Sequence, residues 1–352
     1  MPYCHKCGAK LQEDAHFCHR CGTPVMATPT AAPAPVKPLR KDPVMLGAIV
    51  LIAILLTAVI VIAVAAVPFS RFDFNQTNHD SHPNIRTLNL DFYADVGEVN
   101  VATQNINDYN ILIHVSANGS RSLLRSSNIE VTFTNETVGD VLTITSKVTV
   151  EGGFLSNTDV DCVIYVNPAL NLNLNVTSRL GQVSLTAQEN ATLQSVNLNS
   201  NAGTVQANLQ ENVTVAGDIS LETNMGTVHY RMSETTVEGN CTVNLQSNMG
   251  SVNMDITQTT TLSGNLKVNA DTSMGSVNVG LKIDGDVGAK ITSETNLGNI
   301  DTDVRNFSGD KSPLQSNNYP AASNIEIDNH TNLGSININA AYQSSTVPIV
   351  RA

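Results

Sequence analysis

The sequence predicts an all-β protein whose largest domain is a parallel β-helix, a solenoid of stacked coils. The first observation is a motif that occurs eight times, from ADVGEV to TNLGSI: Gly, one residue, then Val or Ile, with Asn two residues before the Gly in most copies. From the second copy to the seventh, the intervals between motif glycines are 22, 23, 24, 25 and 23 residues. Such a steady period indicates one supersecondary unit stacked on copies of itself. The glycines are Gly97, Gly181, Gly203, Gly226, Gly250, Gly275, Gly298 and Gly334.

The second observation is that alternating runs flank the glycines, as at residues 218–222, 265–269 and 276–279. Alternation with β-branched residues predicts strands. The glycine suits a turn that needs a positive φ. At this repeat length we expect three short strands per coil.

Asparagine recurs two residues before the motif glycine, and Ser273 replaces it once. Asn is common in turns because it tolerates the left-handed region. Since the period holds over five consecutive intervals, we expect these residues to form a side-chain ladder along the stack. They are Asn201, Asn224, Asn248, Asn296 and Asn332.

The region before Gly181 is also rich in predicted strands, at residues 111–115, 129–133, 141–150, 160–166 and 170–176. The residues Val-Asp-Cys-Val-Ile-Tyr-Val-Asn-Pro at 160–168, the alternating Leu-Asn run at 170–176 and Leu-Gly-Gln-Val at 180–183 resemble a known family. These are the β-helix domains labelled "putative adhesin", whose function is otherwise unknown. The resemblance covers residues 87–340 and implies a β-helix with a surface role.

The N-terminus carries two Cys-x-x-Cys motifs separated by ten residues, each followed by a glycine. Four thiolates at this spacing can bind one zinc ion tetrahedrally, and a module of this size has no core of its own without metal. Disulfides or reactive thiols are the alternative interpretation. The predicted ligands of one structural Zn2+ are Cys4, Cys7, Cys18 and Cys21, with His5, His16 and His19 as bystanders. The pattern resembles the short zinc ribbons of many prokaryotic, especially archaeal, membrane proteins.

A Pro/Ala-rich segment follows, and then residues 44–67 contain no charged side chain. As a helix this segment would be about 36 Å long, enough to cross a hydrocarbon core of about 30 Å. More than forty residues precede it, which favours an uncleaved signal anchor over a signal peptide. Lys37, Arg40 and Lys41 lie on its amino side. The positive-inside rule therefore predicts a single-pass protein with a cytoplasmic N-terminus and an extracellular C-terminal domain.

The full fold class is thus all-β, a right-handed parallel β-helix or solenoid preceded by a zinc ribbon and one transmembrane helix. Residues 1–70 contain six basic and three acidic residues, and the remainder contains 13 and 28. An acidic exterior repels nucleic acid, so we expect no nucleic-acid partner. The predicted domains are a zinc ribbon (1–26), a Pro/Ala-rich linker (27–43), a transmembrane helix (44–67), a juxtamembrane stalk (68–86), the β-solenoid (87–343) and a C-terminal tail (344–352).

The interval between Gly298 and Gly334 is 36 residues, about a dozen more than one coil needs. An insertion into a solenoid is expected to project as a loop outside the stacked core. The excess lies near residues 305–320 and includes Phe307 and Tyr319. We therefore expect deletion of residues 306–319 to leave thermal stability nearly unchanged, and the loop is either a contact site or inert.

The remaining candidate chemistry is sparse. Cys162 and Cys241 stand at different distances from their repeat glycines, so we expect two buried single thiols rather than a disulfide. Asp255 and Asp303 share a repeat position but are expected two coils apart, with Gly280 between them. We identify no catalytic residues and no cofactor site besides the zinc.

These observations favour a non-enzymatic, membrane-anchored surface protein that mediates adhesion or contact with the cell envelope, through a ligand that the sequence does not identify. The alternative is a transmembrane sensor or assembly factor whose zinc ribbon contacts a cytoplasmic protein partner. A carbohydrate-active β-helix enzyme is the weaker alternative, because it would need carboxylates clustered on adjacent coils.

Overall fold

A computed structural model describes residues 3–12, 15–24, 70–121, 128–151, 158–188 and 190–343. The chain divides into two compact units, Met1–Ala66 and Val67–Ala352. None of the described residues forms a helix long and apolar enough to cross a membrane. The predicted linker (27–43), transmembrane helix (44–67) and C-terminal tail (344–352) lie outside the described residues.

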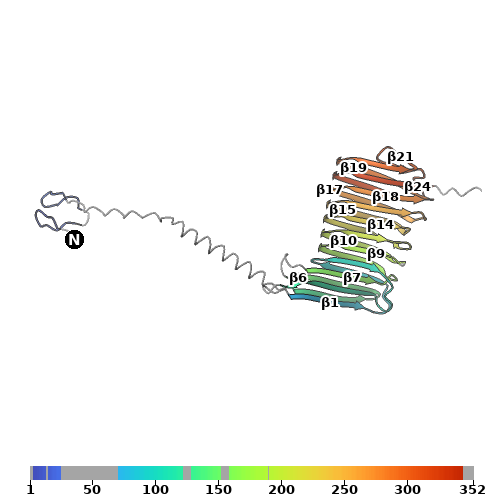
Figure 1. Ribbon diagram of the computed structural model, residues 1–352, viewed down its shortest axis with the longest axis horizontal. Coiled ribbons are helices and arrows are strands. Elements are labelled where there is room, and N and C mark those ends of the chain that lie inside the picture. Colours follow the sequence, from blue (N-terminus) through green and yellow to red (C-terminus); the bar gives the residue numbers. More distant parts are fainter. Residues whose placement is uncertain are drawn as a thin grey trace, which may run out of the picture. The chain divides into compact units, whose positions relative to one another are not determined.

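The second unit is all-β in its described residues and consists of two facing sheets (Figure 1). Sheet 1 contains, in spatial order, β1 (Ser70–Asp80), β4 (Ile111–Arg121), β7 (Thr158–Val166), β3 (Glu98–Thr103), β9 (Val183–Ala187), β11 (Val205–Leu209), β14 (Val228–Ser233), β16 (Val252–Gln258), β18 (Val277–Asp284), β24 (Ile336–Gln343) and β20 (Ile300–Arg305).

Sheet 2 contains, in spatial order, β21 (Phe307–Ser308), β22 (Leu314–Ser316), β19 (Val287–Leu297), β23 (Ser323–Leu333), β17 (Ser263–Met274), β15 (Thr236–Met249), β12 (Thr214–Val215), β10 (Thr192–Ala202), β8 (Asn171–Leu180), β2 (Thr87–Ala94), β6 (Val141–Glu151) and β5 (Asn128–Val138). β13 (Ile219–Met225) pairs with β10 and β15, beside β12.

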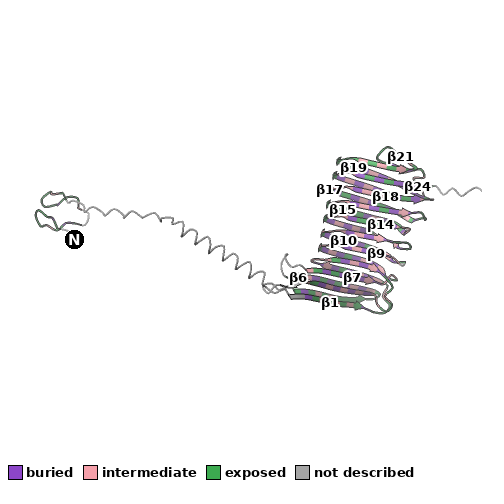
Figure 2. Ribbon diagram, in the orientation of Figure 1, coloured by how far each residue is buried: buried purple, intermediate pink, exposed green. Residues whose placement is uncertain are grey.

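Each coil gives one strand to sheet 2, turns at the motif glycine and gives the next strand to sheet 1. The expectation of three short strands per coil is therefore wrong. The run before each glycine continues as one long strand, 14 residues in β15, and only the coil with β12 and β13 is interrupted. Buried and exposed residues alternate along the strands, and the buried apolar side chains form one core between the sheets (Figure 2).

The turn glycines are stacked directly on one another. The Gly226 N–H donates to the carbonyl of Met249 at 2.9 Å, and a Cβ on Gly226 would overlap the carbonyl oxygen of Gly203. Its φ is +150°, which side chains other than glycine rarely adopt. Both the backbone conformation and the neighbouring coil therefore require glycine here.

A Ser or Thr three residues before the glycine completes the turn in every coil except that of Gly97, where the residue is Ala94. The Ser247 Oγ donates to the Gly226 carbonyl at 2.9 Å, and Ser247 is fully buried. The same bond to the glycine of the adjacent coil recurs at 2.8–3.1 Å from Ser200, Thr223, Thr272, Thr295 and Thr331. The repeat thus carries a Ser or Thr whose hydroxyl pairs with a glycine carbonyl at the corner of the stack.

The predicted asparagine ladder is confirmed. The Asn224 amide donates to Asn201 at 2.7 Å, and the Asn248 amide donates to Asn224 at 2.5 Å. On the other side of Ser273, the Asn296 amide donates to Asn332 at 2.8 Å. Serine is too short to continue the chain of amides, so the ladder is divided into two parts at that coil.

The coils are not stacked in the order of the sequence. The last coil, β23 and β24, lies between β17–β18 and the outermost coil, β19–β20. The chain therefore skips one position, forms the outer coil and then returns to fill the gap. In spatial order the turn glycines are Gly97, Gly181, Gly203, Gly226, Gly250, Gly275, Gly334 and Gly298.

The long interval between Gly298 and Gly334 contains this return, and the prediction of a loop outside the core is wrong. The antiparallel pair β21–β22 covers β19, pairing with it at Lys290 and Ile291. Leu314 of β22 is fully buried, and the Ala289 N–H donates to Ser316 Oγ at 2.8 Å. Residues 306–319 thus contribute to the core, so their deletion would expose apolar side chains.

Antiparallel strands close the other end of the stack. β1 pairs with β4, which pairs with β7, and β5 pairs with β6. Residues 68–86, predicted as a stalk, therefore include a strand of the domain. Asp80 of β1 is buried and accepts hydrogen bonds from His82, Asn110 and Asn135 of β5. Burial raises the pKa of this carboxyl, but these bonds outweigh it and hold the pKa below its usual value.

The stacked glycines generate a prediction. Gly226→Ala should lower the free energy of unfolding by about 2–4 kcal/mol, because the new Cβ meets the backbone of the adjacent coil. Gly139→Ala is the matched control: Gly139 has a φ of +64° but no atom within 4 Å of the added Cβ, so it should cost only about 1–2 kcal/mol. Urea unfolding followed by circular dichroism measures both. If both variants lose the same free energy of unfolding, close stacking of the coils does not contribute to the requirement for glycine.

Candidate metal centre and polar groove

Two short turns with the same hydrogen bonds form the N-terminal unit. The Cys4 N–H donates to Ala9 and the Gly8 N–H donates to Cys4; the Cys18 N–H donates to Thr23 and the Gly22 N–H donates to Cys18, all at 2.8 Å. Gly8 and Gly22 have φ values of +68° and +67°, which explains why each Cys-x-x-Cys motif is followed by glycine. Each turn therefore presents two thiols on one side.

The two turns bring the four predicted zinc ligands together. The Sγ atoms of Cys4, Cys7, Cys18 and Cys21 all lie within 4.8 Å of one another, and the pairs Cys4–Cys21 and Cys7–Cys18 are 3.6 Å apart. Tetrahedral zinc with Zn–S bonds of about 2.3 Å requires sulfur atoms about 3.8 Å apart. The cluster contains no histidine. The donor set therefore fits one zinc ion with no position left for water.

The surroundings of two thiols favour the thiolate that zinc requires. Hydrogen bonds from the Thr23 hydroxyl and backbone lower the pKa of Cys21 to about 6. Backbone N–H groups of Arg20 and Cys21 lower the pKa of Cys18. Cys4 and Cys18 are buried with Leu11 in a small core. With so few apolar residues, the unit depends on the metal for its stability, so the zinc is structural.

Cys162 and Cys241 are both free and buried, as predicted. Cys162 belongs to β7 in sheet 1, whereas Cys241 belongs to β15 in sheet 2. Burial raises the pKa of Cys162 to about 12. These thiols are packed as small apolar side chains rather than as reactive groups.

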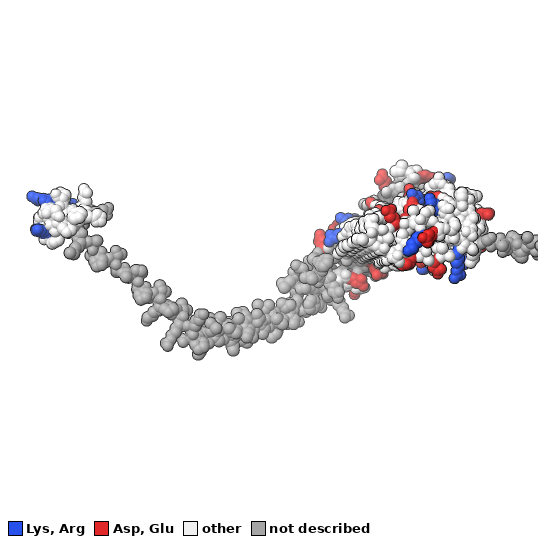
Figure 3. Space-filling model, turned by 90° about the horizontal axis from the view of Figure 1, so that it is seen from above, with Lys and Arg blue, Asp and Glu red and all other residues white. Residues whose placement is uncertain are grey.

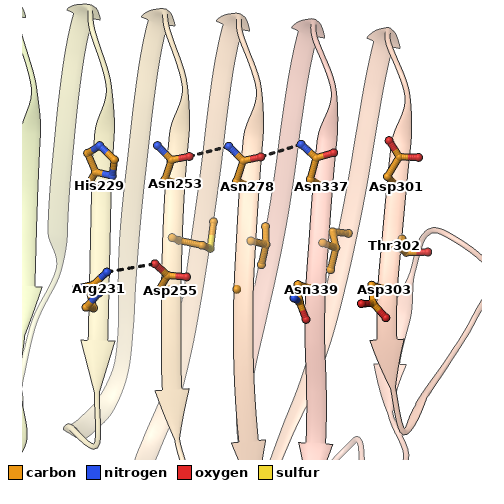
Figure 4. Close-up of a pocket in the computed structure, with 14 residues that line it drawn as sticks. His229, Arg231, Asn253, Asp255, Asn278, Asp301, Thr302, Asp303, Asn337 and Asn339 are labelled. Carbon is orange, nitrogen blue, oxygen red and sulfur yellow. Dashed lines mark hydrogen bonds and ion pairs between the residues drawn. The ribbon is translucent and has the colours of Figure 1, made fainter.

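A broad open groove of about 810 Å³ crosses the outer face of sheet 1, over β14, β16, β18, β24 and β20 (Figure 4). One row of side chains runs across all five strands. The Asn278 amide donates to Asn253 at 2.7 Å, and the Asn337 amide donates to Asn278 at 2.8 Å. His229 lies at one end of this row and Asp301 at the other. The amides hold one another in place, and each retains a second N–H for a ligand.

A second row lies beside the first and contains the hollow of the groove. Arg231 and Asp255 are 3.7 Å apart in an exposed ion pair, and Gly280 follows on the next strand. Glycine leaves a gap in the row, and Asp255 Oδ1 lies where a side chain on Gly280 would begin. Asn339 and then Asp303 complete the row.

The order of this row corrects the sequence analysis. Asp255 and Asp303 are separated by Gly280 and also by Asn339, because β24 is inserted between β18 and β20. They are three strands apart instead of two, and do not act as a pair. Asn253, Asn278 and Asn337 each stand three residues after their motif glycine. This signal is present in the sequence but becomes informative only when the stacking order is known.

The groove offers amide donors, amide acceptors and carboxylates on a rigid surface. On the face drawn in Figure 3, charged side chains of both signs are scattered over a mostly uncharged surface. Asp301 and Asp303 make the β20 end of the groove acidic. This chemistry suits an extended ligand with many hydroxyl groups, and disfavours polyanions.

An apolar ridge follows the glycine turns along the same stack. It consists of the residue before the glycine in five adjacent coils, paired one to the next: Met225, Met249, Met274, Leu333 and Leu297. Each of these side chains is 44–67% exposed. The sequence shows the ridge only as the variable position of the motif.

Comparison with known proteins shows what the chain is similar to. The zinc-ribbon domain family matches residues 3–25. This match and the cysteine cluster together show that residues 3–25 are a zinc ribbon that holds one structural zinc ion. No curated protein matches the chain.

Three solved structures are distantly similar to it. A "putative cell adhesion protein" from Clostridium sporogenes is 14% identical, with a TM-score of 0.39, over 76% of this chain and 100% of that one. A "putative adhesin" from Bacteroides fragilis is 11% identical, with a TM-score of 0.30, over 76% and 98%. A "putative adhesin" from Parabacteroides merdae is 10% identical, with a TM-score of 0.25, over 76% and 95%.

The metal centre generates a prediction. Cys18→Ser in the full chain should abolish stoichiometric zinc, because three thiolates leave one corner of the tetrahedron open. His16→Ala is the control and should retain one zinc ion per chain. Metal analysis and the absorption spectrum after cobalt substitution measure both, and cobalt should give an all-thiolate tetrahedral spectrum. Loss of metal from His16→Ala, or a spectrum with nitrogen ligands, would contradict this assignment.

Proposed function

We propose that this chain is a membrane-anchored cell-surface protein with a non-enzymatic role in adhesion or cell-envelope contact. In this proposal residues 44–67 anchor the chain, the zinc ribbon is cytoplasmic, and the second unit is a right-handed parallel β-solenoid outside the cell. The charge bias around residues 44–67 and the reducing environment that zinc-binding thiols need support this orientation.

The observation that carries the binding role is the groove over β14, β16, β18, β24 and β20. It is open rather than enclosed, and its asparagines are already fixed by their ladder. A surface fixed in advance loses little side-chain entropy when it binds, which favours recognition of an extended polar ligand. Polysaccharide of an envelope or of a neighbouring cell has the required hydroxyl groups.

A sensor or assembly factor is the second candidate. Tyr3 and Phe17 occupy corresponding places in the two turns of the zinc ribbon and are 66% and 65% exposed. Exposed aromatic side chains are common at protein interfaces. A cytosolic protein that binds the ribbon and requires both aromatics would favour this role over simple anchoring.

The proposed orientation predicts labelling from outside the cell. A cysteine introduced at Gln343, an exposed position at the end of β24, should react with a membrane-impermeant maleimide on intact cells. A cysteine introduced at Thr30 should react only after the cells are lysed. The unmodified chain gives the background from its own cysteines. The reverse pattern would contradict the orientation.

The groove predicts a variant that loses binding without losing stability. Gly280→Asn should fill the hollow and displace only the end of the Asp255 side chain. It should weaken binding of envelope fragments by about tenfold or more, equivalent to one or two lost contacts. Stability should rise slightly, because glycine inside a strand costs about 0.5–1 kcal/mol.

Thr186→Asn is the matched control, since Thr186 belongs to the same row on β9, outside the groove. It introduces the same side chain and should leave binding unchanged. The measurement is retention of envelope fragments on beads that carry the full chain, with thermal unfolding of each variant. Binding that survives Gly280→Asn would remove the groove from the proposal.

A further inference from the structure

The two ends of the stack are closed differently. At the β1 end, antiparallel strands cover both sheets, and Phe72, Phe74 and Phe133 of β1 and β5 pack on the core. At the other end, β21–β22 covers β19 of sheet 2. Among the described residues, β20 of sheet 1 pairs with β24 alone. One edge of sheet 1 is therefore open.

The backbone of β20 presents hydrogen-bonding groups at this edge. The Ile336 N–H donates to the carbonyl of Asn299, which fixes the register of β24 against β20. In a parallel ladder, successive residues direct their N–H and C=O groups to opposite sides. Residues Ile300, Thr302 and Val304 therefore direct theirs away from β24. Such an edge is a template for another strand.

The core beneath β20 is also incomplete. In β24, the inward side chains Ile336, Ile338 and Ala340 are at most 3% exposed. The corresponding Ile300 and Val304 of β20 pack on the core but remain partly exposed. A further strand beside β20 would cover them as β24 covers β18, so apolar burial favours its addition.

The outward side chains of β20 determine which strand fits. Asp301, Asp303 and Arg305 are exposed on the same face, so this row has two carboxylates followed by one guanidinium. Cross-strand pairing with opposite charges is stabilising, so basic residues fit opposite the two aspartates. A second copy of this chain is a poor partner. The part of the chain after position 70 contains 28 acidic and 13 basic residues, so two copies repel each other electrostatically. The charge therefore favours a basic strand.

We propose that β20 binds an extended segment of another protein by strand addition. The segment alternates basic residues, which face Asp301 and Asp303, with apolar residues, which cover Ile300 and Val304. Main-chain hydrogen bonds hold the segment, and the alternating side chains select it. This site shares Asp301 and Asp303 with the end of the groove but differs from it in binding mode, since it uses the edge of the sheet rather than its face.

The probe is a nine-residue peptide that alternates lysine with valine, titrated into the full chain in detergent and followed by calorimetry. A peptide that alternates glutamate with valine is the control ligand. We expect the lysine peptide to bind about tenfold more tightly than the glutamate peptide, since two charge pairs change sign. Hydrogen exchange should slow at the amides of Ile300, Thr302 and Val304 when the lysine peptide is bound.

Two variants test the site. Thr302→Pro removes one edge donor and obstructs an incoming strand, and an edge strand tolerates proline where its N–H faces solvent. This substitution should weaken binding of the lysine peptide by about tenfold or more. The double substitution Asp301→Asn and Asp303→Asn should weaken binding of the same peptide about fivefold. The matched control replaces Asp159 and Asp161 by Asn, an exposed pair of the same spacing on β7, which has partners on both sides; it should have no effect.

The proposal is overturned if the two peptides bind equally, if the variants at 301 and 303 bind like the control pair, or if exchange slows at another edge. If Thr302→Pro does not fold, the charge variants and the exchange pattern still decide. Dimerisation that Thr302→Pro abolishes would identify a second copy as the occupant instead. Peptide binding that occurs only after removal of residues 344–352 would identify the chain's own tail.

Discussion

The close stacking of glycine on glycine at one corner is the constraint on which the rest of this structure depends. At that corner the chain passes from one sheet to the other, and the glycine carbonyl needs a partner outside the regular ladder. The Ser or Thr hydroxyl three residues before the next glycine supplies the partner. With the corner fixed, every strand starts in the same register, and the same side-chain types stand above one another in each row. The asparagine ladders, the apolar ridge and the groove all follow from this register.

The local features of the fold could be predicted from the sequence, and the long-range order could not. Strand positions, the glycine turns and the ladder of Asn201, Asn224 and Asn248 depend on residues close to one another or one repeat apart. The zinc ribbon could also be predicted from the sequence, because its four ligands lie on two short turns. In contrast, Asn278 contacts Asn337, 59 residues away, with an entire coil between them in the sequence. Successive coils present nearly equivalent edges, so the spacing of the motif cannot distinguish a neighbour in sequence from a neighbour in space.

The same limit explains what was missed in the candidate site. Asp255, Gly280, Asp303 and Asn339 all stand five residues after a motif glycine and could be assigned to one row. The place of Asn339 between Gly280 and Asp303 follows only from β24 filling the gap beside β18. The hairpin of residues 307–316 looked like an inserted loop because its two short strands lack a clear alternation. The hairpin contributes to stability because it buries Leu314. That burial depends on the outer coil, whose strand β19 the hairpin covers. The predicted number of strands per coil was wrong for a related reason. The repeat length limits the perimeter of a coil, but it does not determine into how many strands that perimeter is divided.

The return of the chain into its own stack makes completion of the stack wait for the coil formed by β23 and β24. Residues 323–343 hold the last two strands in sequence among the described residues, yet their place is inside both sheets rather than at an edge. Until they arrive, the strands on either side of the gap have exposed ladders and exposed apolar side chains. A nascent or prematurely terminated chain is therefore an aggregation-prone intermediate with a gap in its core, whereas a stack in sequential order could lose its last coil and remain intact. β23 and β24 act as a closing piece, and they make the integrity of the whole stack depend on residues 323–343.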